Sequence, residues 1–239
     1  MSCEHEHTHG HGGHHGHGGH GDHDGHSHVA PVPTSASQSL LSKVDVPHVR
    51  ALNMANPPEE VQKLFKTQDD KYRLKPVVRS DCDAQLILHI PFVNSSVKLH
   101  SLILRTNGEK YCPKTIKLWK NDKAVDFDNC SSKRPTCTLT HPLVGVAYND
   151  DVPEVLESDD SFVEHFLPRH LFTGVQHLTV FVEDIHDDSE EESHLHYVEL
   201  RGEASELSKD PVITLYESAP NPADHKKLAL GESSHVSLD

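Results

Sequence analysis

Histidine is the residue type here that most suggests chemistry, because 23 of the 239 residues are histidines. Eleven of them lie between His5 and His28, together with eight of the 13 glycines. Imidazoles at alternating positions, as from His5 to His11, chelate Zn²⁺, Ni²⁺ or Cu²⁺ without any fold. A flexible, pH-tunable solubility tail explains the same composition. We therefore assign no metal site to this segment and keep metal handling as an alternative function.

His194 and His196 are the other candidate metal ligands. They flank Leu195 in a segment expected to be extended, so both side chains point to the same face. Third and fourth ligands cannot be identified beside them, and a pair that follows an acidic loop is more often simply exposed. We expect two exposed histidines and no metal site.

The remaining reactive residues do not form a catalytic set. The sequence contains no GxSxG, HExxH, Walker or dinucleotide-binding motif. Asp126 and Asp128 place two carboxylates on one side of an extended segment, but a glycosidase pair needs a defined separation across a sugar. Trp119 is the single tryptophan that could stack on a sugar, and we expect it in the core. His165 and His170 have a spacing with no recognisable role. We expect no catalytic residue, no cofactor and no enzyme activity.

The five cysteines are spread along the chain without a CxxC pair. This spacing encodes neither a thioredoxin-type redox centre nor a compact zinc knuckle. Cys130 and Cys137 are close enough in sequence to bridge two strands, but a cytosolic compartment would keep them reduced. Free, mostly structural thiols are expected.

Short strands must position these side chains. From residue 85 the apolar period is two, and Leu86, Leu88 and Ile90 share one face with Phe92. Asn-Ser-Ser at 94–96 suggests a hairpin to the next strand. The expected strands are 85–92, 97–106, 115–119, 136–140, 143–148, 176–183, 195–201 and 212–217.

The short strands and turn residues predict an all-β fold, an antiparallel sandwich or jelly roll with short peripheral helices. The best helix candidate is Glu59 to Lys66, with acidic residues first and lysines last. A parallel α/β sheet is disfavoured because the crossover helices that it needs are missing.

The first 28 residues contain no Leu, Ile, Phe, Trp, Tyr, Lys or Arg. Such a segment cannot bury enough apolar surface to offset its conformational entropy, so we expect it to be disordered. The chain then divides into a tail and linker at 1–33, one β-sandwich domain at 34–219, and a C-terminal tail at 220–239.

The net charge limits the partners. Thirty-seven acidic residues against 22 Lys plus Arg give a formal charge of −15, and the basic stripe that nucleic acid or an anionic membrane needs is missing. No stretch has the length of a membrane span, and the N-terminus has no apolar signal-peptide core. We expect a soluble, intracellular protein with neither type of partner.

Charged residues gather in three segments. Residues 149–160 hold six acids and residues 183–192 hold seven. Both are expected to be solvated loops, with a docking surface for a basic partner as the alternative. A basic cluster precedes the first long strand, and its default interpretation is also a solvated face. The cluster comprises Lys63, Lys66, Lys71, Arg73, Lys75 and Arg79.

Several blocks in order resemble the PITH domain, the C-terminal module of thioredoxin-like proteins found with the proteasome. The resemblance covers roughly residues 34–225, including the closing YESAPNPADHKK. The blocks are DAQLILHIPF, VKLHSLIL, PKTIKLW, VDFD, LTVFVE and HYVELRGEASEL.

This resemblance implies a jelly-roll β-sandwich of the galactose-binding-like kind. It also implies a non-catalytic, monomeric interaction module, an adaptor for the proteasome regulatory particle in the cytoplasm, with the nucleus as a second compartment. The oxidoreductase activity of two-domain relatives is not carried over, because the redox CxxC is missing. A small-ligand or carbohydrate-binding sandwich is the alternative.

Overall fold

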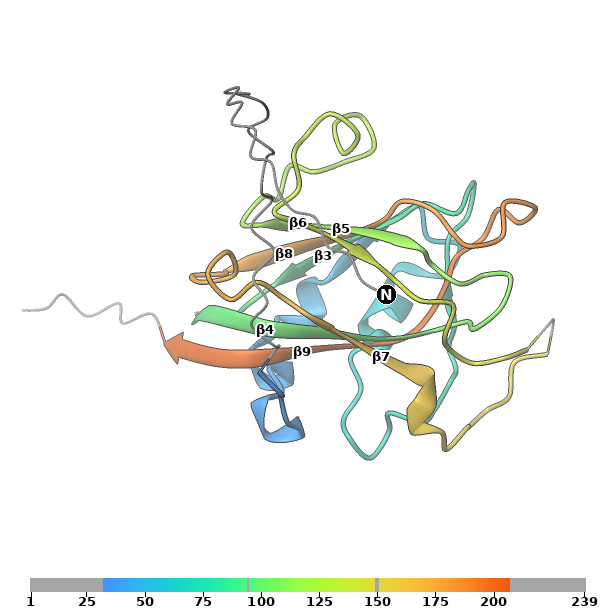
Figure 1. The fold of residues 1–239 in the computed structure, drawn as a ribbon, viewed down its shortest axis with the longest axis horizontal. Coiled ribbons are helices and arrows are strands. Elements are labelled where there is room, and N and C mark those ends of the chain that lie inside the picture. The colour runs from blue at the N-terminus through green and yellow to red at the C-terminus, as the bar shows by residue number, and fades with distance from the viewer. Residues whose placement is uncertain (1–31, 94, 149–150, 207–239) are drawn as a thin grey trace, which may run out of the picture.

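The structure is a computed structural model that describes residues 32–93, 95–148 and 151–206. Within these ranges two antiparallel sheets pack face to face around one main core (Figure 1). The predicted tail at 1–28, the strand at 212–217 and the C-terminal tail lie outside the described residues.

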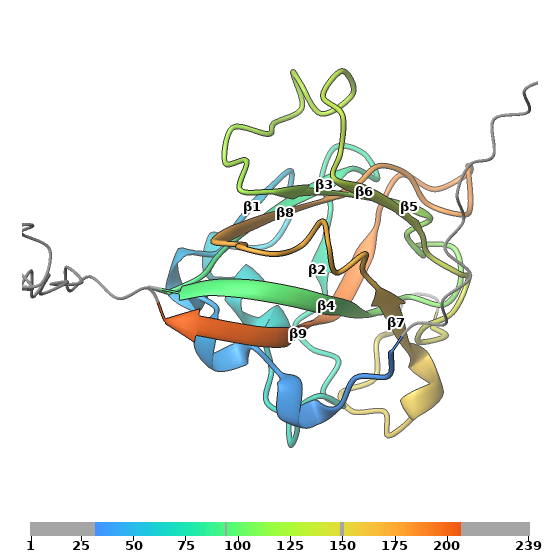
Figure 2. The same cartoon turned by 60° about the vertical axis from the view of Figure 1, so that its left-hand side comes forward.

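The first sheet has five strands in the order β1-β3-β8-β5-β6. Their bounds are β1 Arg50–Leu52, β3 Leu86–Pro91, β8 His177–Val182, β5 Thr115–Lys120 and β6 Cys137–Thr140. The second sheet has four strands in the order β2-β9-β4-β7. Their bounds are β2 Val78–Arg79, β9 His194–Glu206, β4 Ser95–Thr106 and β7 Phe162–Phe166. Figure 2 shows the two layers edge-on.

Alternating apolar side chains fill the space between the sheets, as the period of two predicts. The side chains of Leu86, Leu88 and Ile90 in β3 are buried in the main core. In β8, the main core buries the side chains of Leu178, Val180 and Val182. Burying a row of this kind stabilises a strand by roughly 1.5–3 kcal/mol per large side chain.

The outer face of the five-stranded sheet is also covered. Ile87 and Phe181 point away from the main core and pack with Trp119, Val125 and Cys130 in a second cluster under the loop after β5. Strands β3 and β8 are therefore buried on both faces. Trp119 is only 3% exposed, which confirms its expected place in the core.

The predicted hairpin between the first two long strands is wrong. Strand β3 pairs with β1 and β8, whereas β4 pairs with β9 and β7 in the other sheet. The turn carries the chain from one layer to the other. Each strand turns one apolar face toward the shared core. A period of two is therefore expected both for consecutive strands that pair within one sheet and for consecutive strands that lie in opposite sheets.

Two other strand predictions need correction. The strand expected to end at Arg201 continues to Glu206, because its pairing with β4 continues past a register shift next to Gly202. A Cβ atom at Gly202 would come within 2.1 Å of the Lys98 carbonyl oxygen. The segment 143–148 is not a strand, and Val146 forms only an isolated bridge with Asn107.

The helices of the described residues are short 3₁₀ turns. They are η1 Ala36–Gln38, η2 Leu41–Lys43, η3 Val46–His48, η4 Pro58–Leu64 and η5 Asp159–Ser161. The predicted helix at 59–66 corresponds to η4, which buries Val61 and Leu64. It follows Pro57 and spans seven residues, which is long for a 3₁₀ helix. None of these helices has the length and apolar character to cross a membrane.

Candidate functional site

A hydrogen-bonded group of buried side chains lies at the start of β9. His194 and His196 point to the same face, as their spacing predicts, but they are 4% and 0% exposed, so the expectation that they are exposed is wrong. The hydroxyl of Tyr148 joins them, 2.9 Å from Nδ1 of His194 and 2.8 Å from Nε2 of His196. The two rings share a phenol.

The carbonyl oxygen of Leu74 fixes the protons in this group. It lies 2.9 Å from Nδ1 of His196 and can only accept, so that nitrogen carries a proton. Burial lowers the pKa of His196 to about 3, so the ring is neutral and its Nε2 accepts from the Tyr148 hydroxyl. Tyr148 then has no proton left for His194, and Nδ1 of His194 must donate to the phenol oxygen.

His194 is therefore the place where the group takes up a proton. Its Nε2 lies 3.1 Å from Oε2 of Glu192. In the neutral ring both atoms are acceptors, whereas a proton on Nε2 makes this contact an ion pair. Burial lowers the pKa of His194, and the hydrogen bond and charge of Glu192 act in the opposite direction.

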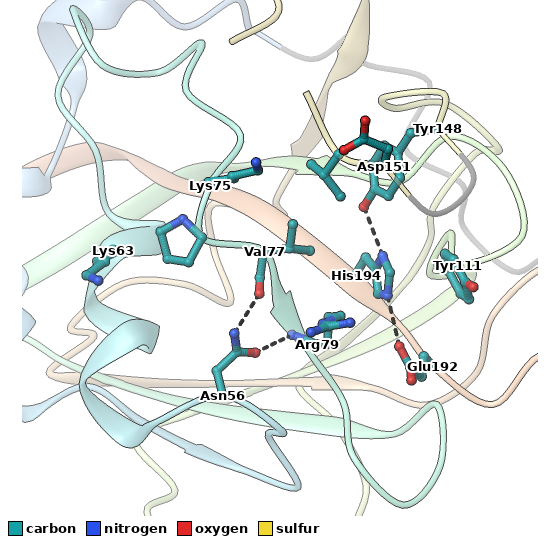
Figure 3. Close-up of a pocket in the computed structure, with 12 residues that line it drawn as sticks. Asn56, Lys63, Lys75, Val77, Arg79, Tyr111, Tyr148, Asp151, Glu192 and His194 are labelled. Carbon is teal, nitrogen blue, oxygen red and sulfur yellow. Dashed lines mark hydrogen bonds and ion pairs between the residues drawn. The ribbon is translucent and has the colours of Figure 1, made fainter. Parts of the chain in front are cut away.

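A pocket of about 790 Å³ opens beside His194 at the edge of the four-stranded sheet (Figure 3). Arg79 is the cross-strand neighbour of His194, so the two side chains share a face. The ring of Tyr111 stacks on His194 with the ring centroids 4.1 Å apart. Strand pairing thus places a guanidinium, an imidazole and a phenol around one opening.

The amide of Asn56 closes the outer edge of β2. Its oxygen accepts from the backbone N–H of Arg79 at 2.9 Å, and its nitrogen donates to the carbonyl of Val77 at 2.9 Å (Figure 3). These bonds occupy backbone groups that an edge strand otherwise exposes. The backbone of Arg79 is therefore held from both sides, by β9 and by Asn56.

The basic cluster is not the uniform solvated face expected from the sequence. Lys63, Lys75 and Arg79 line this pocket. Lys66 donates instead to the backbone carbonyls of Arg73 and His196, and burial lowers its pKa to about 8. The cluster divides because η4 and β2 fold against the start of β9.

A second surface forms around the acidic segment 183–192. Within it, Lys110 pairs with Glu190 at 3.1 Å, and Asp187 accepts from the backbone and hydroxyl of Ser189. Asp188 and Glu191 are exposed and make no side-chain contact within the described residues. Leu143 lines the same hollow and is 54% exposed.

The other predicted candidates do not converge. Asp126 lies in a turn, not in an extended segment, and accepts from the backbone N–H of Asn129. His165 contacts His141 at 2.8 Å, and His170 is not part of that contact. In the described part of the chain, no three His, Cys, Asp or Glu residues are grouped to hold a metal ion. Cys130 and Cys137 are both free thiols.

Sequence reasoning missed Tyr148, His141 and Asn56. Each lies in a segment without regular structure and meets its partners across a long sequence separation, 46 residues from Tyr148 to His194. No local pattern in these segments identifies a partner so distant in the chain.

Two antiparallel layers around one core, with polar groups gathered at the edge of a sheet and in the loops, define an antiparallel jelly-roll β-sandwich. The family model of the PITH domain matches residues 30–220. The chain belongs to the PITH domain family.

Relatives support this assignment along most of the chain. PITH domain-containing protein 1 of Danio rerio is 30% identical over 197 residues, which cover 82% of this chain and 85% of the relative. A PITH domain-containing protein of Schizosaccharomyces pombe is 28% identical over 198 residues, 83% of this chain and 88% of the relative. Among solved structures, CBM32-3 from a family 31 glycoside hydrolase of Clostridium perfringens superposes with a TM-score of 0.43 at 8% identity. That match covers 70% of this chain and 97% of the module.

Proposed function

We propose that this PITH domain is a non-catalytic protein-interaction module, an adaptor that associates with the regulatory particle of the proteasome. The proteasome is proposed as partner from the family resemblance. The chemistry of the partner's surface is proposed from the geometry of this domain. The observation that carries the proposal is the acidic and apolar surface formed by residues 183–192 and Leu143.

This surface has the chemistry of a docking face for a basic partner. Asp188 and Glu191 have no cation of their own within the described residues, so their charges are available to an incoming lysine or arginine. Leu143, which is 54% exposed and lines the same hollow as Asp188, supplies apolar area beside these charges. An apolar centre with a charged rim is a common arrangement in protein interfaces, and the charges steer association.

The test is a pull-down of the tagged full-length protein from cell lysate, with proteasome regulatory subunits quantified by mass spectrometry. The double variant Asp188→Asn, Glu191→Gln removes two charges that have no partner among residues 32–93, 95–148 and 151–206, so the fold should be unaffected. The matched control is Glu157→Gln, Asp160→Asn, which removes two equally exposed charges from the other acidic segment.

We expect regulatory subunits to co-purify with the wild type and with the control variant. The amount of these subunits captured by the Asp188→Asn, Glu191→Gln variant should be several-fold lower. If no regulatory subunit rises above background with the wild type, the adaptor proposal is wrong. If wild type and both variants capture them equally, the acidic surface is not the docking face.

Carbohydrate binding has less support. Trp119 is buried, so it cannot stack on a sugar, and Phe127 in the following loop is 38% exposed with its ring against Phe181. This arrangement leaves no open tryptophan or tyrosine platform in that loop.

A further inference from the structure

We propose that the pocket beside His194 binds the anionic group of a ligand, a carboxylate or a phosphate, with Arg79 as its principal donor. This site is separate from the acidic docking surface, and neither proposal depends on the other. The argument rests on one unpaired guanidinium, the way its strand is fixed, and the charges around it.

Arg79 is the one cation of this lining without an anionic partner in the described part of the chain. Its guanidinium makes no hydrogen bond or ion pair within the described residues, although the protein carries a net charge of −15. Its backbone is fixed by pairing with His194 and by the Asn56 amide, so the side chain emerges from a rigid point at the pocket wall. A guanidinium offers a planar fork of N–H donors that matches carboxylate and phosphate oxygens.

Two lysines extend the positive side of the pocket. Lys63 and Lys75 line it and contact Glu60 and Glu154, each at 3.4 Å. Both lysine side chains are about half exposed, at 55% and 49%, and such surface pairs contribute little. A ligand anion can therefore compete for these ammonium groups at small cost.

The two acids of the lining differ in their effect on an anion. Glu192 is directed at Nε2 of His194, and a proton taken up there neutralises it. Asp151 also lines the pocket and makes no hydrogen bond or ion pair within the described residues, so its charge opposes an incoming anion. The pocket is therefore selective: it favours an anionic group placed at Arg79 and away from Asp151.

The pocket has room for more than an inorganic ion. A volume of about 790 Å³ lies in the range of sites for small organic ligands, roughly 300–1,000 Å³. Tyr111, stacked on His194, forms a flat wall beside Arg79. The expected ligand is a small organic anion, or an acidic group on a larger molecule, whose uncharged part rests on this wall.

The experiment uses the full-length protein and two probes, sulfate for the tetrahedral phosphate-like group and acetate for the carboxylate. Binding is followed by NMR chemical shifts at constant ionic strength, with chloride as the reference anion. The test variant is Arg79→Gln. The matched control is Arg134→Gln, which removes an exposed arginine that also lacks a partner within the described residues.

We expect saturable shifts at Arg79, Tyr111 and His194, with affinity weakened about tenfold or more in Arg79→Gln, because a charge-assisted hydrogen bond is lost. Arg134→Gln should bind as the wild type does. The tighter of the two probes identifies the ligand group as phosphate-like or carboxylate. If both probes bind Arg79→Gln as tightly as wild type, or if neither shifts the pocket residues, the proposal is wrong.

Two further arms test the charges around Arg79. Asp151→Asn should tighten anion binding, because a repelling charge is lost, and weaker binding would contradict the role given to Asp151. The groups facing His194 are Arg79, Tyr111, Lys110, Tyr148 and Glu192, with His196 behind Tyr148. Lowering the pH from 8 to 6 raises the fraction of protonated His194, and a proton there neutralises Glu192. Sulfate should therefore bind more tightly at pH 6, by a small factor because burial lowers the pKa of His194. The opposite order would contradict the assignment.

Discussion

Buried histidines should make the folded domain sensitive to mild acid. Burial lowers the pKa of His196 and of His141 to about 3, and that of His177 to about 4. In the unfolded chain an imidazole titrates near ~6.5. Between these values the unfolded state binds protons that the folded state does not. The free energy of unfolding is therefore highest above pH ~6.5 and falls as the pH is lowered.

The expected loss is large. A group that stays neutral in the folded state and has an unfolded pKa of ~6.5 contributes a loss of about 1.9 kcal/mol between pH 7 and pH 5. Three such groups give about 6 kcal/mol, against a total stability of roughly 5–15 kcal/mol for a domain. Four other histidines, whose pKa values are lowered by full or partial burial, add to this loss. They are His89, His100, His165 and His194.

The assay is urea unfolding at pH 7, 6 and 5, followed by the fluorescence of the single tryptophan, Trp119, which is buried. The informative variant is His177→Leu. The ring of His177 makes no hydrogen bond within the described residues, and its Nδ1 is buried without a partner. The substitution by leucine thus removes one titrating group without breaking a hydrogen bond within the described residues.

The free energy of unfolding of the wild type should fall by several kcal/mol between pH 7 and pH 5. For His177→Leu the fall should be smaller by about 1.9 kcal/mol. Carboxylates such as Asp122, whose pKa is lowered by the hydrogen bond from Lys133, contribute only at lower pH. A wild-type loss below about 2 kcal/mol, or an equal loss in the variant, would refute the assignment of neutral buried histidines.

Two further predictions concern stability. Tyr148→Phe removes the hydroxyl between His194 and His196 and should lower the free energy of unfolding by about 2–4 kcal/mol, since two buried nitrogens lose their partner. Tyr111→Phe should change it by less than about 0.5 kcal/mol, and equal effects in urea unfolding would contradict the hydrogen-bond chain. Gly202→Ala places a Cβ 2.1 Å from the Lys98 carbonyl oxygen and should cost about 3 kcal/mol or more. Ser205→Ala is the control, and a neutral Gly202→Ala would show that β4 and β9 can separate.

The strands were predictable where one face meets the core. Leu86, Leu88 and Ile90 revealed β3 because each alternate side chain is buried between the sheets. The short strands β1, β2 and β7 were not predicted, since two to five residues are too few to establish a period. Pairing was also beyond the sequence: the 94–96 turn suggested a hairpin, but the two strands it connects lie in different layers.

Only part of the candidate site could be predicted from the sequence. The spacing of His194 and His196 correctly placed both rings on one face. Their burial depends on Tyr148 and Leu74, which come from other parts of the chain, so a local pattern of charge suggested exposure. The exposed acids Asp188 and Glu191 were correctly expected in a loop, because adjacent like charges discourage packing.

The basic and acidic segments meet at one sheet edge, although each was expected to be solvated on its own. Pairing of β2 with β9 brings Arg79 next to His194, two residues after Glu192. Opposite charges so placed would ordinarily form an ion pair, but Glu192 is directed at His194 and forms none with Arg79. His194 thus engages Glu192, and the Arg79 guanidinium keeps its donors for a ligand. This arrangement arises from strand pairing between residues more than a hundred positions apart, which no charge count along the chain can reveal.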